Sequence, residues 1–186
     1  MICAMTDPEY PRTPSKITPS ARIEALGIAL PKPWGRTFST RPKPWTIGPG
    51  VQVYAEFVRV VGRRVTISGH LPLDDDGGVA GPYGRVGAEV SLEQAQACAE
   101  RVALGILASL KLELGSLDRV GAWVRLFGMV NAAPDFHDYP SVVNAASRII
   151  YDVFGDDVGR HSRVAIGVGG LPLNVPVEIE AELELG

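Results

Sequence analysis

The sequence has little cysteine, no long hydrophobic run and almost no net charge. Its two cysteines, Cys3 and Cys98, are too few for a disulfide framework, so we expect a reducing, cytoplasmic location. No apolar stretch approaches the roughly 20 residues of a membrane span, and we expect no membrane partner. A net charge of −3 over 186 residues gives no general attraction to phosphate backbones, which argues against a nucleic-acid partner.

Histidine is also scarce, and its spacing offers no metal site. His70, His137 and His161 are far apart in the chain, and none has a cysteine or carboxylate at the spacing of a metal-ligand motif. The acidic run at 74–76 lacks the alternating ligand positions of a calcium loop, which favours a solvated turn. No glycine pair has the lysine of a phosphate-binding loop or the context of a dinucleotide fold. We therefore expect neither a metal nor a cofactor.

Proline is frequent in the first 50 residues and separates them from the rest of the chain. Residues 1–20 hold four prolines and few apolar side chains, a composition that predicts disorder. A short helix is predicted at 22–26, and the prolines that follow exclude regular structure up to residue 50. Trp34 and Trp45 lie in this stretch. Because such rings are usually buried, we expect the extension to drape over a domain formed by residues 51–186.

Residues 51–186 combine strand and helix periodicities. Ser91 and Gln94 form a capping box, and the apolar residues that follow recur with helical period up to Gly115. A second helix is predicted at 139–154. Strands are predicted at 52–61, 64–68, 120–130, 162–169 and 175–185. This order predicts an α+β fold with one mixed sheet and two helices on a single face, which leaves the other face to solvent or a partner.

The last two predicted strands differ in what they place on each face. Glutamates occupy positions 178, 180, 182 and 184 with apolar residues between them, so four carboxylates share one face, which a solvated surface explains for most of them. The preceding strand has Arg163, Ala165 and two glycines on one side. Alternate glycines weaken a strand unless something approaches closely, which predicts contact with another subunit or a ligand.

Arg163 and Glu178 are the one pair in this region that suggests chemistry. If the last two strands pair as a hairpin, both side chains can point to the same face. A guanidinium can bind a carboxylate through two parallel hydrogen bonds. A carboxylate can orient or deprotonate water. The spacing alone leaves two interpretations open, a structural ion pair and a substrate site.

Several segments follow the order of motifs in a known family. Residues 67–72 (ISGHLP) resemble its S-G-Q-x-P segment, residues 87–96 its helix entry, and residues 133–136 the stretch before its second helix. Residues 159–181 (GRHSRVAIGVGGLPLNVPVEIEA) resemble its C-terminal signature of an arginine, a Leu-Pro turn and a V-E-I-E-A strand. By these motifs, residues 51–185 resemble the RidA (YjgF-type) family of imine/enamine deaminases, formerly labelled endoribonuclease L-PSP, in a longer-chain branch.

The resemblance implies a fold, an assembly and an activity. The fold is that of the Bacillus-type chorismate mutase, assembled as a homotrimer with a ligand cleft at each subunit interface. The reaction is hydrolysis of a small 2-imino or enamine acid to a 2-keto acid and ammonia, with no cofactor. By position in the motif, Arg163 would bind the substrate carboxylate and Glu178 would activate water. Four further positions are assigned to the substrate site: Tyr54, Ser68, His70 and Ala165.

The chain departs from the family pattern at three of these places. Val164-Ala165 replaces a Ser-Cys pair, His70 stands where the family has glutamine, and Tyr54 is offset from the family's aromatic residue. Two other functions stay open. One is a non-catalytic trimer that binds or senses small carboxylates. The other is a ribonuclease, against which the acidic balance and the lack of a basic, aromatic surface argue.

Overall fold

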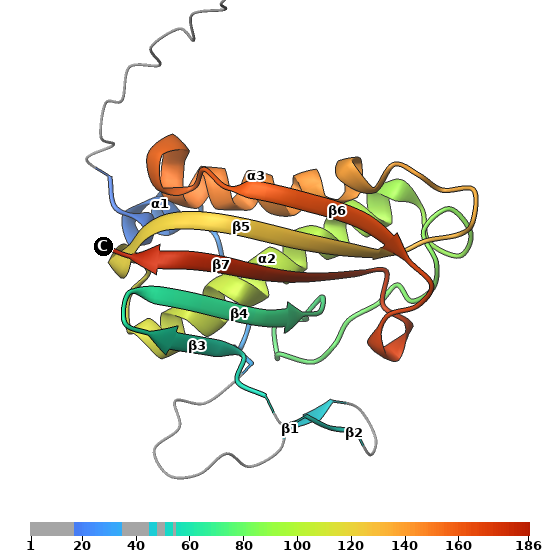
Figure 1. Cartoon of the computed structure of the whole chain (residues 1–186), viewed down its shortest axis with the longest axis horizontal. Coiled ribbons are helices and arrows are strands. Elements are labelled where there is room, and N and C mark those ends of the chain that lie inside the picture. Colours follow the sequence, from blue (N-terminus) through green and yellow to red (C-terminus); the bar gives the residue numbers. More distant parts are fainter. Residues whose placement is uncertain (1–16, 35–44, 48–50, 54) are drawn as a thin grey trace, which may run out of the picture.

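A five-stranded sheet is the centre of the computed structural model, which describes residues 17–34, 45–47, 51–53 and 55–186 (Figure 1). The strand order is β3-β4-β7-β5-β6. The strands are β3 (Val58–Val61), β4 (Arg64–His70), β5 (Val120–Asn131), β6 (Ser162–Val168) and β7 (Val177–Leu185). Strands β5 and β6 pair in parallel, and the other neighbours are antiparallel. The predicted α+β class with one mixed sheet is confirmed.

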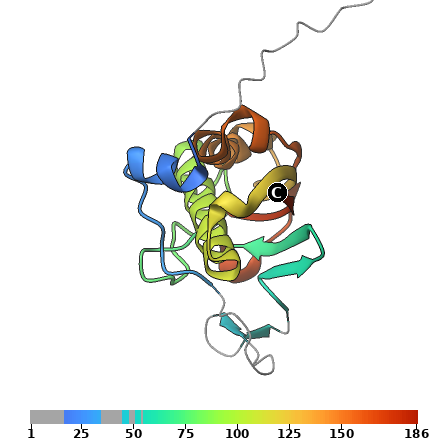
Figure 2. The same ribbon diagram turned by 90° about the vertical axis from the view of Figure 1, so that its left-hand side faces the viewer.

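Two long helices cover one face of this sheet (Figures 1 and 2). Helix α2 (Leu92–Leu114) begins at the predicted capping box, where the Ser91 hydroxyl accepts from the Gln94 N–H and the Gln94 side chain accepts from the Ser91 N–H. Helix α3 (Tyr139–Val158) follows β5 and is capped by Asp138. In the part of the chain that the structure describes, no helix has the length and apolar character needed to cross a bilayer.

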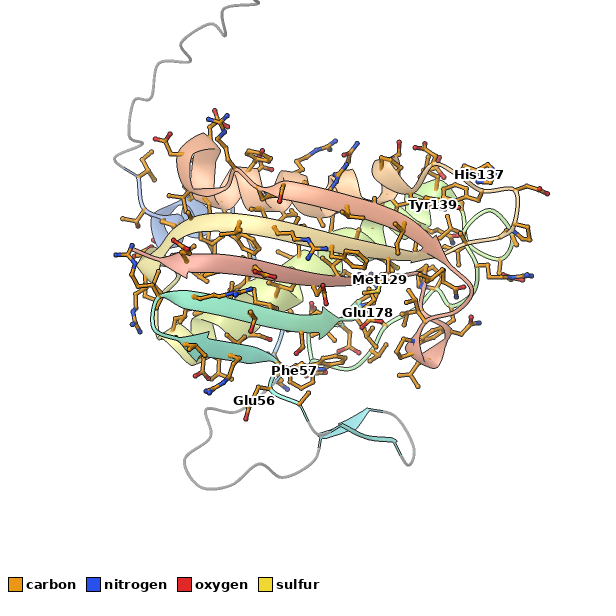
Figure 3. The ribbon with its side chains drawn as sticks, in the orientation of Figure 1. Glu56, Phe57, Met129, His137, Tyr139 and Glu178 are labelled. Carbon is orange, nitrogen blue, oxygen red and sulfur yellow. The ribbon has the colours of Figure 1, made fainter. Side chains whose placement is uncertain are left out.

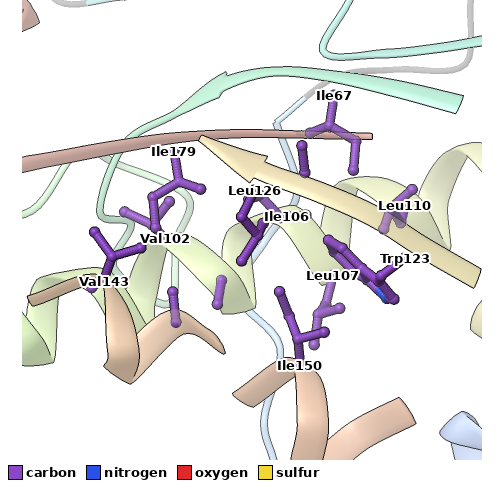
Figure 4. Packing of buried hydrophobic residues seen from close by; sticks show 14 of the residues in the cluster. Ile67, Val102, Ile106, Leu107, Leu110, Trp123, Leu126, Val143, Ile150 and Ile179 are labelled. Carbon is purple, nitrogen blue, oxygen red and sulfur yellow. The ribbon is translucent and has the colours of Figure 1, made fainter. Parts of the chain in front are cut away.

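The hydrophobic core lies between the helices and the sheet (Figure 4). Ile179 and Leu183 of β7 are completely buried, together with Leu126 of β5 and Leu107 of α2. Each side chain of this size contributes about 1.5–3 kcal/mol when it is fully buried. Because every second residue of β7 enters this layer, the glutamates between them face away from the helices.

Strand β7 occupies the middle of the sheet, so the predicted hairpin between the last two strands is wrong. Strand β5 separates β6 from β7, and the 3-10 turn η2 (Pro172–Asn174) joins these two strands at the end of the sheet. The reason lies in the side chains that face the helices. Strand β7 presents Ile179 and Leu183 and belongs in the core, whereas β6 presents Arg163 and Ala165 and suits an edge.

Strand β6 turns its small residues toward α3. Gly167 lies beneath the Tyr139 ring, and a Cβ at position 167 would overlap that ring. The close approach predicted for this strand is therefore made within the subunit. Val164 and Ile166 lie on the open face of the sheet, where they remain 38% and 37% exposed. The open face is thus apolar along β6 and acidic along β7.

The predicted strand at 52–61 is divided into two elements. Strand β2 (Val51–Val53) pairs with β1 (Trp45–Ile47) in a separate two-stranded sheet, and β3 begins only at Val58. The prediction that prolines exclude regular structure before residue 50 is therefore wrong for β1. Tyr54, which was predicted at the substrate site, lies outside the described residues.

Residues 17–34 form a strap that crosses the helix layer (Figure 2). Helix α1 (Pro19–Ala25) is capped by Thr18 and packs on α3 and on the 3-10 turn η1 (Leu117–Arg119), which confirms a short helix here with an earlier start. The Ser20 N–H donates to the Asp118 carboxylate over 2.8 Å. Residues 17–20 thus belong to the strap, while the rest of the predicted tail, residues 1–16, lies outside the described residues.

The far end of the strap is held by Trp34. Its indole N–H donates to the Gly77 carbonyl over 2.9 Å, and its ring lies 5.0 Å from the Phe57 ring, centroid to centroid. The Trp34 carbonyl accepts the Ser109 hydroxyl of α2. The prediction that Trp34 packs on the domain is confirmed, whereas the side chain of Trp45 lies outside the described residues.

We expect Trp34→Ala to lower the free energy of unfolding by roughly 2 kcal/mol, because a half-buried indole loses both its packing and its hydrogen bond. Urea unfolding followed by circular dichroism measures this. Leu26→Ala, at the exposed end of α1, is the matched control and should change stability by less than about 0.5 kcal/mol. Equal stability of wild type and Trp34→Ala would contradict a structural role for the strap.

Candidate functional site

Glu178 lies on the open face of the sheet, where β4, β7 and β5 run side by side. Met129 is its register partner on β5, and Figure 3 shows the two side chains close together. On the other side the carboxylate lies against Gly69 of β4, and a Cβ at Gly69 would overlap the Glu178 carboxyl group. Gly69 sits in a β-bulge between Ile67 and His70. The bulge and its glycine make the space that Glu178 occupies.

The Glu178 carboxylate has no hydrogen-bond or ion-pair partner among the residues that the structure describes. It is half-buried, and this burial raises its pKa above the ordinary carboxyl value, with a further contribution from the negative charge of Glu180. Glu182, four positions beyond Glu178 on the same strand, is instead paired with Arg64 over 2.8 Å. An unpaired, partly desolvated carboxylate is costly for stability, which makes Glu178 the strongest functional candidate on this face.

Ser68 and His70 occupy the same strand but point to different places. The Ser68 hydroxyl donates to the Glu56 carbonyl over 2.6 Å. His70 is completely buried on the helix side, where Nδ1 lies 2.7 Å from the Ser68 carbonyl and Nε2 lies 2.9 Å from the Ser109 hydroxyl. Burial lowers the pKa of His70 to about 4, so its ring is neutral near pH 7.

His70 therefore points away from Glu178, to the helix side of the sheet, and its role in substrate binding stays a prediction. The physical reason is the bulge. It places Ser68 and Gly69 opposite a single stretch of β7 and directs His70 inward. There the ring packs edge-on against Phe57, with centroids 5.6 Å apart, and joins the group that anchors the strap.

Arg163 belongs to a second cluster, between β6 and α3. Its Nη1 donates to Asn144 Oδ1 over 2.7 Å and to the Ser147 hydroxyl over 3.2 Å. The Nε and Nη2 edge of the guanidinium makes no hydrogen bond within residues 17–34 and 55–186. That edge carries two parallel N–H groups, the geometry that binds a carboxylate through two hydrogen bonds. Ala165 follows two positions along the same side of the strand.

Arg163 and Glu178 are not brought together within one subunit. Arg163 lies on the helix side of β6, Glu178 lies on the open side of β7, and β5 separates the two strands. Both residues were predicted from the sequence, but Asn144 and Ser147, which bond to the guanidinium, were not, and neither was His161, which bonds to Ser147. The sequence contained a sign of Asn144 and Ser147, because two polar residues three positions apart on a predicted helix lie on the same side of it.

The two clusters contain no arrangement for a metal. In the described part of the chain, no group of three or more histidine, cysteine, aspartate or glutamate side chains is placed to ligate one ion. Cys98 is buried in α2, and burial raises the pKa of its thiol, so it is a core residue and not a thiolate ligand.

Comparison with known proteins gives consistent results. Residues 49–183 match the family described as "YjgF/chorismate mutase-like, putative endoribonuclease". The chain is 41% identical over 166 residues to Protein TCP17 of Trypanosoma cruzi, which covers 89% of this chain and 93% of TCP17. Among solved structures, Atu1372 of Agrobacterium tumefaciens, a protein of unknown function, is 32% identical, has a TM-score of 0.73, and is matched over 90% of this chain and 92% of its own.

A second solved structure, described as a "putative endoribonuclease" from Shewanella oneidensis, is 26% identical with a TM-score of 0.74, over 90% of this chain and 99% of that one. The family model leaves out residues before 49, whereas these longer matches cover about nine-tenths of the chain. They therefore align with part of the strap as well as with the sheet and helices.

Glu178→Gln should raise the stability of the protein at neutral pH. Because burial raises the pKa of Glu178, the folded protein binds this proton more tightly than the unfolded chain does. The contribution of Glu178 is therefore most favourable below the ordinary carboxyl pKa and is lost as pH rises through the raised value. We expect a gain in urea midpoint for Glu178→Gln at about pH 7 that shrinks toward zero at about pH 4.

Glu184→Gln, at the exposed end of the same acidic row, is the matched control and should show no such pH-dependent gain. A lower stability of Glu178→Gln than of wild type at neutral pH would mean that the carboxylate is held by a favourable partner.

Proposed function

The chain belongs to the YjgF/chorismate mutase-like family, and on this premise we propose that it hydrolyses small reactive 2-imino or enamine acids to 2-keto acids and ammonia. The observation that carries this proposal is the state of Glu178, a half-buried carboxylate with a raised pKa and no partner in the described residues. A carboxylate of raised pKa is a stronger base than usual, which suits the removal of a proton from water near neutral pH.

The other end of the substrate would be held by Arg163. A 2-imino acid has a carboxylate adjacent to its C=N bond, and the Nε and Nη2 edge of Arg163 matches a carboxylate in shape and charge. Asn144 and Ser147 hold the remaining nitrogen of the guanidinium, so the binding edge is oriented before a ligand arrives. The small side chain of Ala165 leaves room beside it.

The reaction adds one water molecule across the C=N bond. The water oxygen bonds to the imine carbon while one water proton passes to Glu178, and the nitrogen takes up a proton from solvent as the C=N bond becomes single. In the resulting carbinolamine Glu178 returns its proton to the nitrogen, the C–N bond breaks and ammonia leaves, and the hydroxyl proton passes to solvent as the C=O bond forms. Imine and water thus become keto acid and ammonia with no net gain or loss of electrons.

A site that uses both residues would have to be formed by two subunits. Arg163 and Glu178 lie on opposite faces of one sheet, so Arg163 of one copy would meet Glu178 of a neighbouring copy. The open face supports such an assembly, because Val124, Val164 and Ile166 on it are 43%, 38% and 37% exposed. Exposed apolar side chains gathered on one sheet face are typical of a subunit interface. We propose a homotrimer, in which each of three equivalent interfaces holds one site.

Two alternative functions, carboxylate binding without turnover and RNA cleavage, differ from the proposed one in the features they require of the site. A carboxylate-binding protein without turnover would keep the Arg163 cluster but would not need an unpaired, destabilising Glu178. A ribonuclease would have to bring phosphates to the open face, where four glutamates lie in a row on β7. That row repels a polyanion, so the endoribonuclease description given to some relatives fits this chain poorly.

We expect Arg163→Ala and Arg163→Lys to lose binding of pyruvate, the product of 2-iminopropanoate hydrolysis, with a cost of about 2–5 kcal/mol. Lysine should not restore binding, because an ammonium group cannot form the planar two-hydrogen-bond contact. Glu178→Gln should instead keep pyruvate binding and lower the rate of imine hydrolysis by roughly a hundredfold or more. Calorimetric titration measures the first effect, and ammonia release from freshly generated 2-iminopropanoate measures the second.

Arg160→Ala, an exposed neighbour on the same segment, is the control for loss of positive charge. Thermal melts of all variants separate loss of function from loss of fold. Full deaminase activity in Glu178→Gln would rule out its proposed role, and pyruvate binding without ammonia release in the wild type would favour the sensing alternative.

The assembly makes a second, independent prediction. Light scattering at micromolar concentration should give the mass of three subunits. If each site takes Arg163 from one subunit and Glu178 from another, an equal mixture of Arg163→Ala and Glu178→Gln subunits, unfolded and refolded together, should regain about a quarter of wild-type activity. Each variant refolded alone should remain inactive. A monomeric mass, or no recovery in a mixture shown to contain mixed trimers, would contradict the shared site.

A further inference from the structure

A chain of hydrogen bonds runs from Arg163 to a histidine that the proposed reaction does not use. Arg163 Nη1 lies 3.2 Å from the Ser147 hydroxyl, which lies 3.0 Å from His161 Nε2. His161 Nδ1 in turn lies 2.6 Å from the Gly159 carbonyl. Ser147 is buried and His161 is half-buried, so this chain is largely shielded from solvent.

The chemistry of these groups fixes where the protons lie. A carbonyl oxygen only accepts, so His161 Nδ1 carries a hydrogen and donates it to Gly159. In the neutral ring Nε2 is then an acceptor, and it accepts the Ser147 hydroxyl proton. The lone pairs of Ser147 are left to accept from Arg163 Nη1. Each hydrogen bond from Arg163 Nη1 to the Gly159 carbonyl then has one donor and one acceptor.

A protonated His161 can be accommodated without breaking the chain. Nε2 would then donate to Ser147, whose oxygen has two lone pairs and can accept from both His161 and Arg163. The Ser147 proton would turn to the backbone carbonyl one helical turn earlier, which serine in a helix commonly uses. His161 therefore has two hydrogen-bonded states that differ by one positive charge beside Arg163.

Resting on the proposed function, we propose that His161 couples carboxylate binding at Arg163 to the uptake of a proton, so that the site binds its ligand more tightly as the medium becomes more acidic. In the free protein a second positive charge next to Arg163 is unfavourable. A bound carboxylate offsets the charge of Arg163 and removes that penalty. By reciprocity, a proton on His161 strengthens binding of the carboxylate by the same factor.

The surroundings of His161 support this direction. Burial lowers its pKa below the ordinary value, and the charge of Arg163 lowers it further, against the raising effect of the Gly159 carbonyl. In the described part of the chain, no carboxylate forms an ion pair with His161 that could hide the effect. Helix α3, which packs beside it, carries the ionisable or charged groups Tyr139, Arg148, Tyr151, Asp152, Asp156 and Asp157, and Arg160 precedes it in the chain; of these, Tyr151 packs on its ring at 5.4 Å between centroids.

The test is calorimetric titration of pyruvate into the full-length protein from about pH 8 down to about pH 5, for wild type and His161→Gln. Glutamine can still accept from Ser147 but cannot be protonated. Wild-type affinity should be constant at high pH, rise as pH falls through the pKa of the ligand-bound state, and level off below that of the free state. The total gain should be roughly tenfold, the order expected for unit charges a few hydrogen bonds apart.

His161→Gln should match the wild type near pH 8 and lose this rise. Since Glu178 also has a raised pKa, the same pair is compared in a Glu178→Gln background, where the difference should persist. His137→Gln, at an exposed histidine, is the control and should keep the wild-type profile. Nuclear magnetic resonance of the His161 ring should show a higher pKa with pyruvate bound than without.

The outcomes separate this inference from the proposed function. Pyruvate binding that depends on Arg163, with the same pH profile in wild type and His161→Gln, would overturn the proton coupling and leave the carboxylate site intact. No pyruvate binding by the wild type would overturn both. An unchanged His161 pKa on pyruvate binding would also overturn the coupling.

Discussion

The central position of β7 is the constraint on which the rest of the structure depends. Its alternation sends Ile179 and Leu183 into the helix layer and Glu178 to the opposite face. Burial of the apolar half keeps the strand between β4 and β5, and this placement in turn fixes Glu178 between Gly69 and Met129. The carboxylate is therefore held by hydrophobic packing on the far side of its own strand, and among the described residues it has no hydrogen bond of its own. An unpaired carboxylate can be maintained there because the core makes up its cost.

Much of this architecture could be predicted from the sequence, because local patterns determine local elements. The capping box at Ser91 and the helical periodicity after it located α2, and the tryptophan at position 34 indicated a segment packed on the domain. Which strands are neighbours could not be predicted in the same way. Alternation assigns residues to the two faces of a strand, but the order of the strands depends on how much apolar surface each strand can bury against the helices. Strand β6 can bury little apolar surface there, because Arg163 and Ala165 lie on its helix side.

The candidate site shows the same division. Glu178 and Arg163 were identified from the resemblance of the C-terminal segment to a family signature, but their relative placement was wrong because it assumed a hairpin. The inward direction of His70 could not be predicted, for a different reason. After a bulge, the residues of a strand point to the opposite faces from those that simple alternation predicts. The only sign of the bulge in the sequence is Gly69, which could equally have been an ordinary strand glycine. The residues around Arg163 come from α3, far from it in the chain, and only the packed structure connects them.

The strap has a consequence for the order in which the molecule is made. Its residues leave the ribosome before the groups that hold it, which are distant in sequence: Gly77 and Ser109 form hydrogen bonds with Trp34, and Asp118 and Asp152 accept hydrogen bonds from α1. During synthesis the strap therefore has nowhere to dock until α2 and α3 exist. Its apolar side chains stay exposed for most of translation, when a nascent chain is most open to misassociation. Seating of the strap is then a late event: protection of Trp34 from solvent would mark a chain whose helix α2 is complete, and docking of α1 would mark the completion of α3.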